Sequence, residues 1–420
     1  MLGGLSVGTT HIHGLLEGED VLATAAAMRA LGATIERLEN GVWRVRGVGV
    51  GGLAEPENML DMGNAGTGAR LLLGMLASHD LTAFLTGDAS LRRRPMQRVI
   101  SPLMRCGAAF VSRTGGRLPL AITGAREPVA IEYRLPVASA QVKSAILLSG
   151  LNATGTTRVI EPEATRDHTE RMMAHFGASV SRTERGGEAV IELAGEAVLR
   201  GAEVTVPADP SSAAFPIAAA LLTPGSDVTL TDVCLNPGRI GLILTLQEMG
   251  ADLTLENERE LNGEPIGDVR VRYSALSGVT VPTGRAPSMI DEYPVLAAVA
   301  ASANGETHML GVGELRVKES DRLAAVAAGL HACGVRADAG ADTLTVYGYN
   351  GPVPGNGAEG TMIATNMDHR IAMAFAVLGL ASRNGVRVDD MRPIATSFPD
   401  FVPLMNGLGA ALCVEAAEGA

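Results

Sequence analysis

Aromatic residues, lysine and cysteine are all scarce in this 420-residue chain. Phe, Tyr and Trp make up only 3% of a sequence that is 46% hydrophobic, so its core has to be built from Ala, Leu, Val and Ile, as where helices pack closely on sheets. The four cysteines lie far apart without a Cys-x-x-Cys pair, which fits a reducing cytoplasm and predicts neither a metal site nor a disulfide framework. No apolar run approaches 18 residues, the length that a membrane span needs at about 1.5 Å per residue. These absences predict a cytoplasmic protein without a membrane segment.

Basic residues are outnumbered, and the net charge of −12 argues against a nucleic-acid or anionic-membrane surface. Lysine occurs twice, at Lys143 and Lys318, and the other 32 of the 34 basic residues are arginine. A lysine that survives in such a sequence indicates a place that needs a compact point charge with mobile donors. The length exceeds the usual limit of about 250–300 residues for a single core, so two domains are expected.

The chain repeats itself. A helical pattern that ends in glycine and enters a strand occurs six times. Glycine at this place supplies the left-handed conformation that releases the chain from a helix. The glycines are Gly32, Gly107, Gly177, Gly250, Gly334 and Gly409. Such periodicity indicates one supersecondary unit used repeatedly, and six units predict two α/β domains of three units each, at residues 1–206 and 207–420.

A second type of helix opens each time with small polar residues, at 63–67, 138–141, 209–212, 290–294 and 367–370. Such residues cap free backbone amides. If these helix N-termini point at a common cleft, their amides and dipoles form an anion site. Arginines add planar donors suited to phosphate and carboxylate groups; they are Arg70, Arg92, Arg93, Arg94, Arg98, Arg166, Arg322 and Arg370. This pattern favours an enzyme for small, multiply anionic substrates.

The stretch from Ala286 to Arg322 has the strongest signs of chemistry. Asp291 and Glu292 interrupt an apolar pattern, and Lys318, Glu319 and Arg322 fall within five positions. The alternative interpretation is a solvated helix start with an i,i+3 pair between Glu319 and Arg322. Elsewhere, His11 and His13 alternate along an expected strand and share one face; we interpret them as exposed strand residues rather than metal ligands.

Nine motifs in order resemble 5-enolpyruvylshikimate-3-phosphate synthase, most closely the bacterial class II branch: GNAGTGAR, RRRPMQR, ASAQVKSA, EPEATRDHTE, DPSSAAFP, SMIDEYP, LRVKESDR, DHRIAM and ATSFPDF. The resemblance implies two domains, each of three βαβαββ units, around a central cleft. It implies transfer of the enolpyruvyl group of phosphoenolpyruvate to the 5-hydroxyl of shikimate 3-phosphate, with release of phosphate, on the shikimate pathway to chorismate and the aromatic amino acids. No metal or organic cofactor is implied, and we expect a monomer.

The resemblance also assigns roles by motif. Asp291 corresponds to the proton acceptor near the 5-hydroxyl, Glu319 to the carboxylate that delivers a proton to the phosphoenolpyruvate methylene, and Lys318 to a neighbouring substrate contact. The implied phosphoenolpyruvate contacts are Gly66, Arg94, Gln141, Arg322 and Arg370. The implied shikimate 3-phosphate contacts are Ser139, Ala140, Gln141, Arg166, Asp291 and Lys318.

The chain departs from that family at its start, because family members carry a strand and a Gly-Asp-Lys-Ser-(x)₃-Arg motif ahead of the first repeat. We therefore expect the first repeat to lack its entering strand and most of its first helix, with Met1 an internal methionine. One alternative is a truncated product with weak or no activity. The other is UDP-N-acetylglucosamine enolpyruvyl transferase, which uses a cysteine in the loop aligned with Leu91–Arg98, where this chain has arginines.

Overall fold

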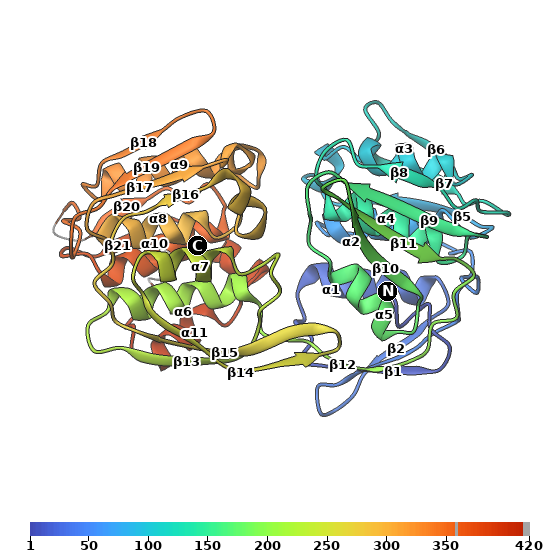
Figure 1. Ribbon diagram of the computed structural model, residues 1–420, viewed down its shortest axis with the longest axis horizontal. Coiled ribbons are helices and arrows are strands. Elements are labelled where there is room, and N and C mark those ends of the chain that lie inside the picture. Colours follow the sequence, from blue (N-terminus) through green and yellow to red (C-terminus); the bar gives the residue numbers. More distant parts are fainter. Residues whose placement is uncertain (358–359, 415–420) are drawn as a thin grey trace, which may run out of the picture. The chain divides into compact units, whose positions relative to one another are not determined.

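The computed structural model describes residues 1–357 and 360–414 and divides into two compact units (Figure 1). The first unit comprises Met1–Val206 together with Leu261–Glu264, and the second comprises Pro207–Glu260 and the chain from Pro265 onward. The short segment Leu261–Glu264 connects two strands of the second unit but packs with the first. The chain therefore passes between the units at three places.

Strands of the first unit form three four-stranded sheets with one shared order. In each, a central strand pairs in parallel with one neighbour and antiparallel with the second strand of the hairpin that follows it in the chain. The first sheet contains β12 (Glu203–Thr205), β1 (Thr9–His13), β3 (Trp43–Arg46) and β2 (Thr34–Arg37). The second contains β4 (Leu60–Asp61), β5 (Thr82–Thr86), β7 (Arg117–Thr123) and β6 (Ala109–Arg113), and the third β8 (Glu132–Arg134), β9 (Thr156–Glu161), β11 (Glu188–Ala194) and β10 (Val180–Arg185).

The parallel neighbour of β1 in the first sheet comes from the far end of the unit. Residues 1–8, ahead of β1, form turns and one isolated bridge, and the fourth strand is β12, which follows the third repeat. A parallel neighbour needs only the right register, not proximity in sequence. Following the repeats along the chain does not predict this pairing, because Glu203 of β12 lies 192 positions from its partner His11.

The second unit repeats this strand order in sheets that have three, four and two strands among the described residues. One sheet contains β13 (Asp227–Cys234), β15 (Glu264–Arg272) and β14 (Asp252–Leu261). The next contains β16 (Thr280–Val281), β17 (Glu306–Leu310), β19 (Thr343–Tyr347) and β18 (Ala337–Ala339), and the last contains β20 (Thr361–Ile363) and β21 (Val386–Val388). In the four-stranded sheet, β17 again pairs in parallel with its entering strand and antiparallel with β19.

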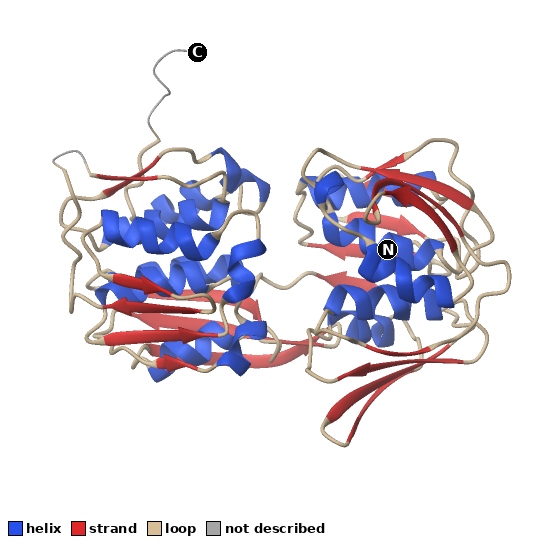
Figure 2. Ribbon diagram, turned by 90° about the horizontal axis from the view of Figure 1, so that it is seen from above, coloured by secondary structure: helices blue, strands red, loops and turns tan. Residues whose placement is uncertain are grey.

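Helices lie between the sheets in each unit (Figure 2). In the first unit they are α1 (Glu19–Ala30), α2 (Gly66–Leu76), η1 (Leu91–Arg93), α3 (Gln97–Arg105), α4 (Ala140–Gly150) and α5 (His168–His175). In the second they are α6 (Pro210–Leu222), α7 (Gly241–Glu248), η2 (Thr283–Ser288), α8 (Tyr293–Ser302), η3 (Gly313–Val317), α9 (Arg322–Ala332), α10 (His369–Leu380), η4 (Arg392–Thr396) and α11 (Phe401–Gly407).

Two classes of helix explain the repeat. Helices α4, α6 and α8 are apolar nearly all round and are buried along almost their whole length, which places them in the interior of their units. Helix α2 packs on α4, and α6, α8 and α10 pack together. The other class ends at the six repeated glycines, all of which have φ between 79° and 106°. The predicted left-handed caps are thus confirmed.

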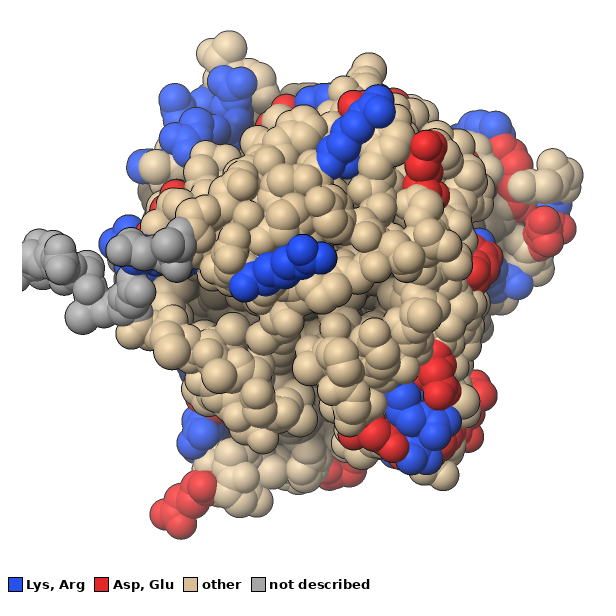
Figure 3. All heavy atoms as spheres, turned by 90° about the vertical axis from the view of Figure 1, so that its left-hand side faces the viewer, with Lys and Arg blue, Asp and Glu red and all other residues tan. Residues whose placement is uncertain are grey.

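Two features concern possible binding partners: the charge of the surface and the length of the helices. The face drawn in Figure 3 carries basic and acidic side chains in small separate groups among uncharged residues, so that face has no extended surface of one charge. Within the two ranges that the structure describes, no helix combines the length and the apolar character needed to cross a bilayer.

Candidate active site

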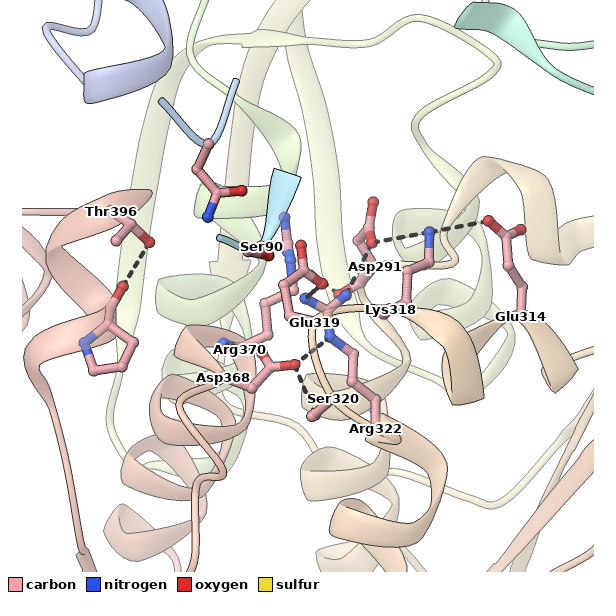
Figure 4. A network of polar contacts seen from close by, with 12 residues as sticks. Ser90, Asp291, Glu314, Lys318, Glu319, Ser320, Arg322, Asp368, Arg370 and Thr396 are labelled. Atoms are coloured by element: carbon pink, nitrogen blue, oxygen red, sulfur yellow. Dashed lines mark hydrogen bonds and ion pairs between the residues drawn. The ribbon is translucent and has the colours of Figure 1, made fainter. Parts of the chain in front are cut away.

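Three helix starts of the second unit bring the predicted catalytic residues together (Figure 4). Asp291 and Glu292 immediately precede α8, which has a proline in its first turn. Lys318 and Glu319 lie between η3 and α9, and the side chain of Asp321 caps α9 by accepting a hydrogen bond from the Ala324 amide at 2.9 Å. These elements are adjacent in space because α8 packs on both α9 and α10.

Arg322, the first residue of α9, is the centre of this cluster. Its side chain is 1% exposed, and its three guanidinium nitrogens each face a different carboxylate. Nη1 lies 3.1 Å from Asp291 Oδ1, Nη2 2.5 Å from Glu319 Oε2 and Nε 2.8 Å from Asp368 Oδ2. Burial alone would lower the pKa of Arg322, but Asp368 and Glu319 outweigh that effect and the pKa is raised. The pair between Glu319 and Arg322 exists, but the alternative of a solvated helix start is wrong for this buried arginine.

The two candidate proton-transfer groups share this arginine but differ in setting. Asp291 also lies 3.7 Å from Lys318 Nζ, whereas Lys318 makes a closer 3.2 Å contact with Glu314 on the preceding turn. Glu319 is about twice as exposed as Asp291. Two carboxylates in different electrostatic settings can divide an acid and a base role between them. The structure therefore brings Asp291, Lys318, Glu319 and Arg322 into one cluster, as the sequence predicted.

Arg370 joins the same cluster from α10. Its Nη1 donates to the Asp291 carbonyl at 3.3 Å and lies 3.6 Å from Glu292 Oε1. Burial raises the pKa of Glu292, against the opposing effect of Arg370, and the same carboxylate accepts a hydrogen bond from the Ser211 hydroxyl. Glu292 thus holds Arg370 next to the backbone of Asp291.

Sequence reasoning named no role for Asp368 or Glu292. Asp368 caps α10 by accepting from the Arg370 amide at 3.0 Å, while its other oxygen accepts from Arg322 and, at 3.0 Å, from the Ser320 hydroxyl. Burial would raise the pKa of Asp368, but the Arg322 guanidinium outweighs it and the pKa is lowered. The sequence signal was the position of Asp368 at a helix start, two residues before Arg370. Thr396 donates to the Pro393 carbonyl at 2.7 Å.

A second cluster surrounds the N-terminus of α2 in the first unit. Gln141, in the first turn of α4, accepts through Oε1 from Arg70 Nη1 at 3.0 Å and from Arg98 Nη2 at 3.1 Å. Its amide nitrogen donates to the Thr67 hydroxyl at 2.8 Å. Burial, together with the neighbouring Arg98 and Arg94, lowers the pKa of Arg70 to about 10. The positive charges of these guanidinium groups repel one another, so this site favours the binding of an anion.

Gly66 and Arg94 complete this cluster. Arg94 Nη2 donates to Asn64 Oδ1 at 2.9 Å and to Ser90 Oγ at 3.2 Å. A Cβ atom at Gly66 would lie 3.0 Å from Arg94 Nη1 and 3.3 Å from Arg70 Nη1, so both guanidinium groups border the space over this glycine. The start of α2 is therefore lined by two guanidinium groups, which suit an anionic ligand at this helix N-terminus.

The predicted shikimate 3-phosphate residues of the first unit occupy two segments. Ser139 caps α4, where its hydroxyl accepts from the Val142 amide at 3.4 Å, and Ala140 and Gln141 are the first two residues of that helix. Arg166 is half-buried in the loop that joins β9 to α5.

His11 and His13 do share one face of β1, as predicted. Both contact the Glu203 carboxylate, at 2.7 Å and 3.0 Å, because the parallel register places Glu203 of β12 beside His11. Within residues 1–357 and 360–414, no three His, Cys, Asp or Glu side chains are grouped to hold a metal ion.

Comparisons with known proteins identify the family. The model of the EPSP synthase (3-phosphoshikimate 1-carboxyvinyltransferase) family matches residues 1–405. The 3-phosphoshikimate 1-carboxyvinyltransferase of Rhodospirillum rubrum is 63% identical over 98% of this chain and 91% of that protein, and that of Acidiphilium cryptum is 59% identical over the same shares. A solved EPSP synthase from Acinetobacter baumannii is 45% identical with a TM-score of 0.89, covering 98% of this chain and 92% of that one.

Proposed function

This chain belongs to the EPSP synthase (3-phosphoshikimate 1-carboxyvinyltransferase) family, and we propose that the two clusters described above carry out the family's reaction. It is a transferase of the shikimate pathway, which leads to chorismate and the aromatic amino acids. In the reaction, the enolpyruvyl group of phosphoenolpyruvate moves to the 5-hydroxyl of shikimate 3-phosphate, and inorganic phosphate leaves.

The observation that carries the assignment of roles is the buried Arg322 with Asp291 and Glu319 on two of its nitrogens. The reaction needs a group that takes the 5-hydroxyl proton and a group that gives a proton to the methylene carbon. Asp291 is the proposed acceptor and Glu319 the proposed donor. One cation that holds both fixes their separation, which is the kind of preorganisation that lowers a barrier.

The chemistry proceeds in two steps. Protonation of the methylene carbon by Glu319 leaves an oxocarbenium-like centre, and the 5-oxygen adds to it as Asp291 takes the hydroxyl proton. The resulting methyl group then returns a proton to the Glu319 carboxylate as the carbon–oxygen bond to phosphate breaks, which restores the enol double bond. The proton that Asp291 took leaves with the phosphate. Lys318, whose ammonium lies 3.7 Å from Asp291 Oδ1, is the proposed neighbouring contact of the substrate.

Binding is assigned to both units. The proposed phosphoenolpyruvate contacts are Gly66, Arg94, Gln141, Arg322 and Arg370. The proposed shikimate 3-phosphate contacts are Ser139, Ala140, Gln141, Arg166, Asp291 and Lys318. Each substrate carries a phosphate and a carboxylate, and the guanidinium groups of the first-unit cluster supply paired donors of matching geometry. Small anionic metabolites are therefore the proposed partners, for a monomer in the cytoplasm.

The test is phosphate release from the two substrates, with the organic product identified by mass spectrometry. We expect release only when both substrates are present, and a product heavier than shikimate 3-phosphate by one enolpyruvyl group in place of hydrogen. Phosphate release from phosphoenolpyruvate without shikimate 3-phosphate, or no release with both, would overturn the proposal. Light scattering checks the monomer, and a dimer would contradict it.

A further inference from the structure

The first unit contains a buried cation that none of the proposed catalytic steps uses. Lys143 lies in the second turn of α4, and its side chain is 0% exposed. Its ammonium group is 2.7 Å from Glu170 Oε1 and 3.2 Å from the Glu161 carboxylate. Burial of an unpaired ammonium group is unfavourable, so the two carboxylates compensate the buried charge of Lys143.

The two carboxylates come from either end of one segment. Glu161 is the last residue of β9, and Glu170 lies in the first turn of α5. Between them runs the loop of residues 162–167, which carries Arg166. Lys143 thus ties both ends of the Arg166 loop to α4, the helix whose first turn contains Gln141.

Hydrogen bonds of hydroxyl groups reinforce the same attachment. The Ser144 and Thr169 hydroxyls hydrogen-bond at 2.6 Å between α4 and α5, and Thr165, within the loop, donates to the Glu161 carboxylate. On the outer side, Arg182 of β10 lies 3.7 Å from Glu161. Burial raises the pKa of Glu170 and Lys143 opposes that rise, so the ammonium and this carboxylate depend on one another.

We propose that Lys143 is a positioning residue for shikimate 3-phosphate: it fixes the loop that carries Arg166 relative to Ser139, Ala140 and Gln141 at the start of α4. This inference rests on the proposed function, since it takes those residues as contacts of that substrate. A hydrophobic side chain could fill the same space at lower desolvation cost, whereas an ammonium held by two carboxylates also specifies where the loop ends lie. Lys143 itself touches neither substrate.

The decisive experiment compares Lys143→Met with the unchanged protein. Methionine keeps an unbranched side chain but removes the charge. We expect the dissociation constant of shikimate 3-phosphate alone, measured by calorimetry, and its KM to rise about 10- to 100-fold, because a small misplacement of a binding group has effects of that size. The KM of phosphoenolpyruvate at saturating shikimate 3-phosphate should change much less.

A matched control separates positioning from stability. Leu147→Ala removes buried packing from α4 one turn further along and leaves the three charges in place. It should lower the melting temperature and leave the affinity for shikimate 3-phosphate largely unchanged, because the contacts of Lys143 with Glu161 and Glu170 remain. If Lys143→Met and Leu147→Ala weaken shikimate 3-phosphate binding equally, or if a folded Lys143→Met binds it normally, the inference is overturned.

A milder variant covers the case in which Lys143→Met does not fold. Glu170→Gln keeps the contact of Lys143 with Glu161 and releases only the α5 end of the loop, so a smaller loss of shikimate 3-phosphate affinity is expected. Normal affinity in this variant would then overturn the inference. Failure of the unchanged protein to bind shikimate 3-phosphate would refute the proposed function, whereas normal binding by every variant refutes the role of Lys143 alone.

Discussion

Each unit has one buried cation that faces several carboxylates, and the two differ in what surrounds them. Lys143 of the first unit is enclosed: the side chains of Glu161 and Glu170 are 0% and 9% exposed. Arg322 of the second unit is equally buried, but Asp291 and Glu319 are 21% and 44% exposed, and only Asp368 is fully covered. One cluster is closed to solvent, while the other opens to it through its carboxylates.

This difference in exposure indicates that the buried charges of Lys143 and Arg322 have different uses. A closed cluster cannot exchange partners with a ligand, so the charge of Lys143 can act only on the position of its neighbours. The carboxylates on Arg322 reach solvent, so they can meet a substrate while one guanidinium keeps them in place. The side chains match these uses, since a compact ammonium suits two converging carboxylates and a planar guanidinium presents donors along three directions.

The largest effect is expected at the exposed side of the Arg322 cluster. Asp291→Asn keeps the shape and the contact with Arg322 but removes the proton acceptor, so kcat should fall about 10²- to 10⁴-fold. The KM of shikimate 3-phosphate should change far less. Steady-state kinetics of phosphate release measure both constants.

Asp321→Asn is the matched control for that substitution. Asp321 is an exposed carboxylate of the same segment, and asparagine caps a helix about as well as aspartate. It should leave kcat near that of the unchanged enzyme. A near-normal kcat in Asp291→Asn would refute the assigned role and, with it, the idea that the open cluster is the reactive one.

The next effect tests whether the planar fork of Arg322 is needed. Arg322→Lys retains the charge but cannot donate along three directions to Asp291, Glu319 and Asp368 at once. We expect kcat/KM to fall about 10²-fold, as when one preorganised donor is removed from a catalytic site. Kinetics and melting temperature are measured together, and an unchanged kcat/KM would mean that any buried cation suffices there.

Sequence reasoning found most of these residues for identifiable reasons. Helix starts were predictable because small polar caps and the six left-handed glycines are local signals. The stretch with Asp291, Glu319 and Arg322 was found because acidic residues interrupt an apolar pattern and charges crowd within five positions, whereas their roles came from the family resemblance. Lysine scarcity singled out Lys143 and Lys318 alike and predicted neither the burial of Lys143 nor its partners.

The missed features are all long-range. Asp368 reaches Arg322 from 46 positions away, and β12 with Glu203 reaches His11 from 192 positions away. Local patterns do not encode which distant segments meet, because packing of the whole unit decides that. The repeats did not predict the pairing of β12 with β1 for the same reason, since β12 comes from beyond the third repeat.

A smaller effect concerns stability and pH. Asp368→Asn keeps the helix cap but removes the charge beside Arg322, and it should lower the free energy of unfolding at pH 7 by about 1–3 kcal/mol, the cost of losing a buried hydrogen bond to a charged group. Because the pKa of Asp368 is depressed in the folded protein, its stabilising contribution is present above the unfolded value of about 3.9 and is lost as the pH falls through the lower folded value.

Urea unfolding at pH 7, 5 and 3 measures this contribution. The difference between Asp368→Asn and the unchanged protein should be constant at pH 7 and 5 and shrink toward pH 3. Asp321→Asn, an exposed surface change, should stay within about 0.5 kcal/mol throughout. A difference that grows toward acid pH would show that Asp368 is not held ionised by Arg322.

The smallest effect concerns cations that belong to neither buried cluster. Arg94 and Arg70 of the first unit have the neutral partners Asn64, Ser90 and Gln141, so an incoming anion meets no competing carboxylate in these contacts. In Gly66→Ala the new methyl group would press on both guanidinium groups, at 3.0 Å and 3.3 Å, and these flexible ends would shift by a few tenths of an ångström. The KM of phosphoenolpyruvate should therefore rise about 10-fold, toward the lower end of what one methyl group can do in a binding site.

Gly284→Ala, where a Cβ meets nothing within 4 Å, controls for the substitution itself and should leave that KM unchanged. An unaltered KM in Gly66→Ala would mean that phosphoenolpyruvate does not approach the start of α2, and the first-unit arginines would then have to serve shikimate 3-phosphate alone.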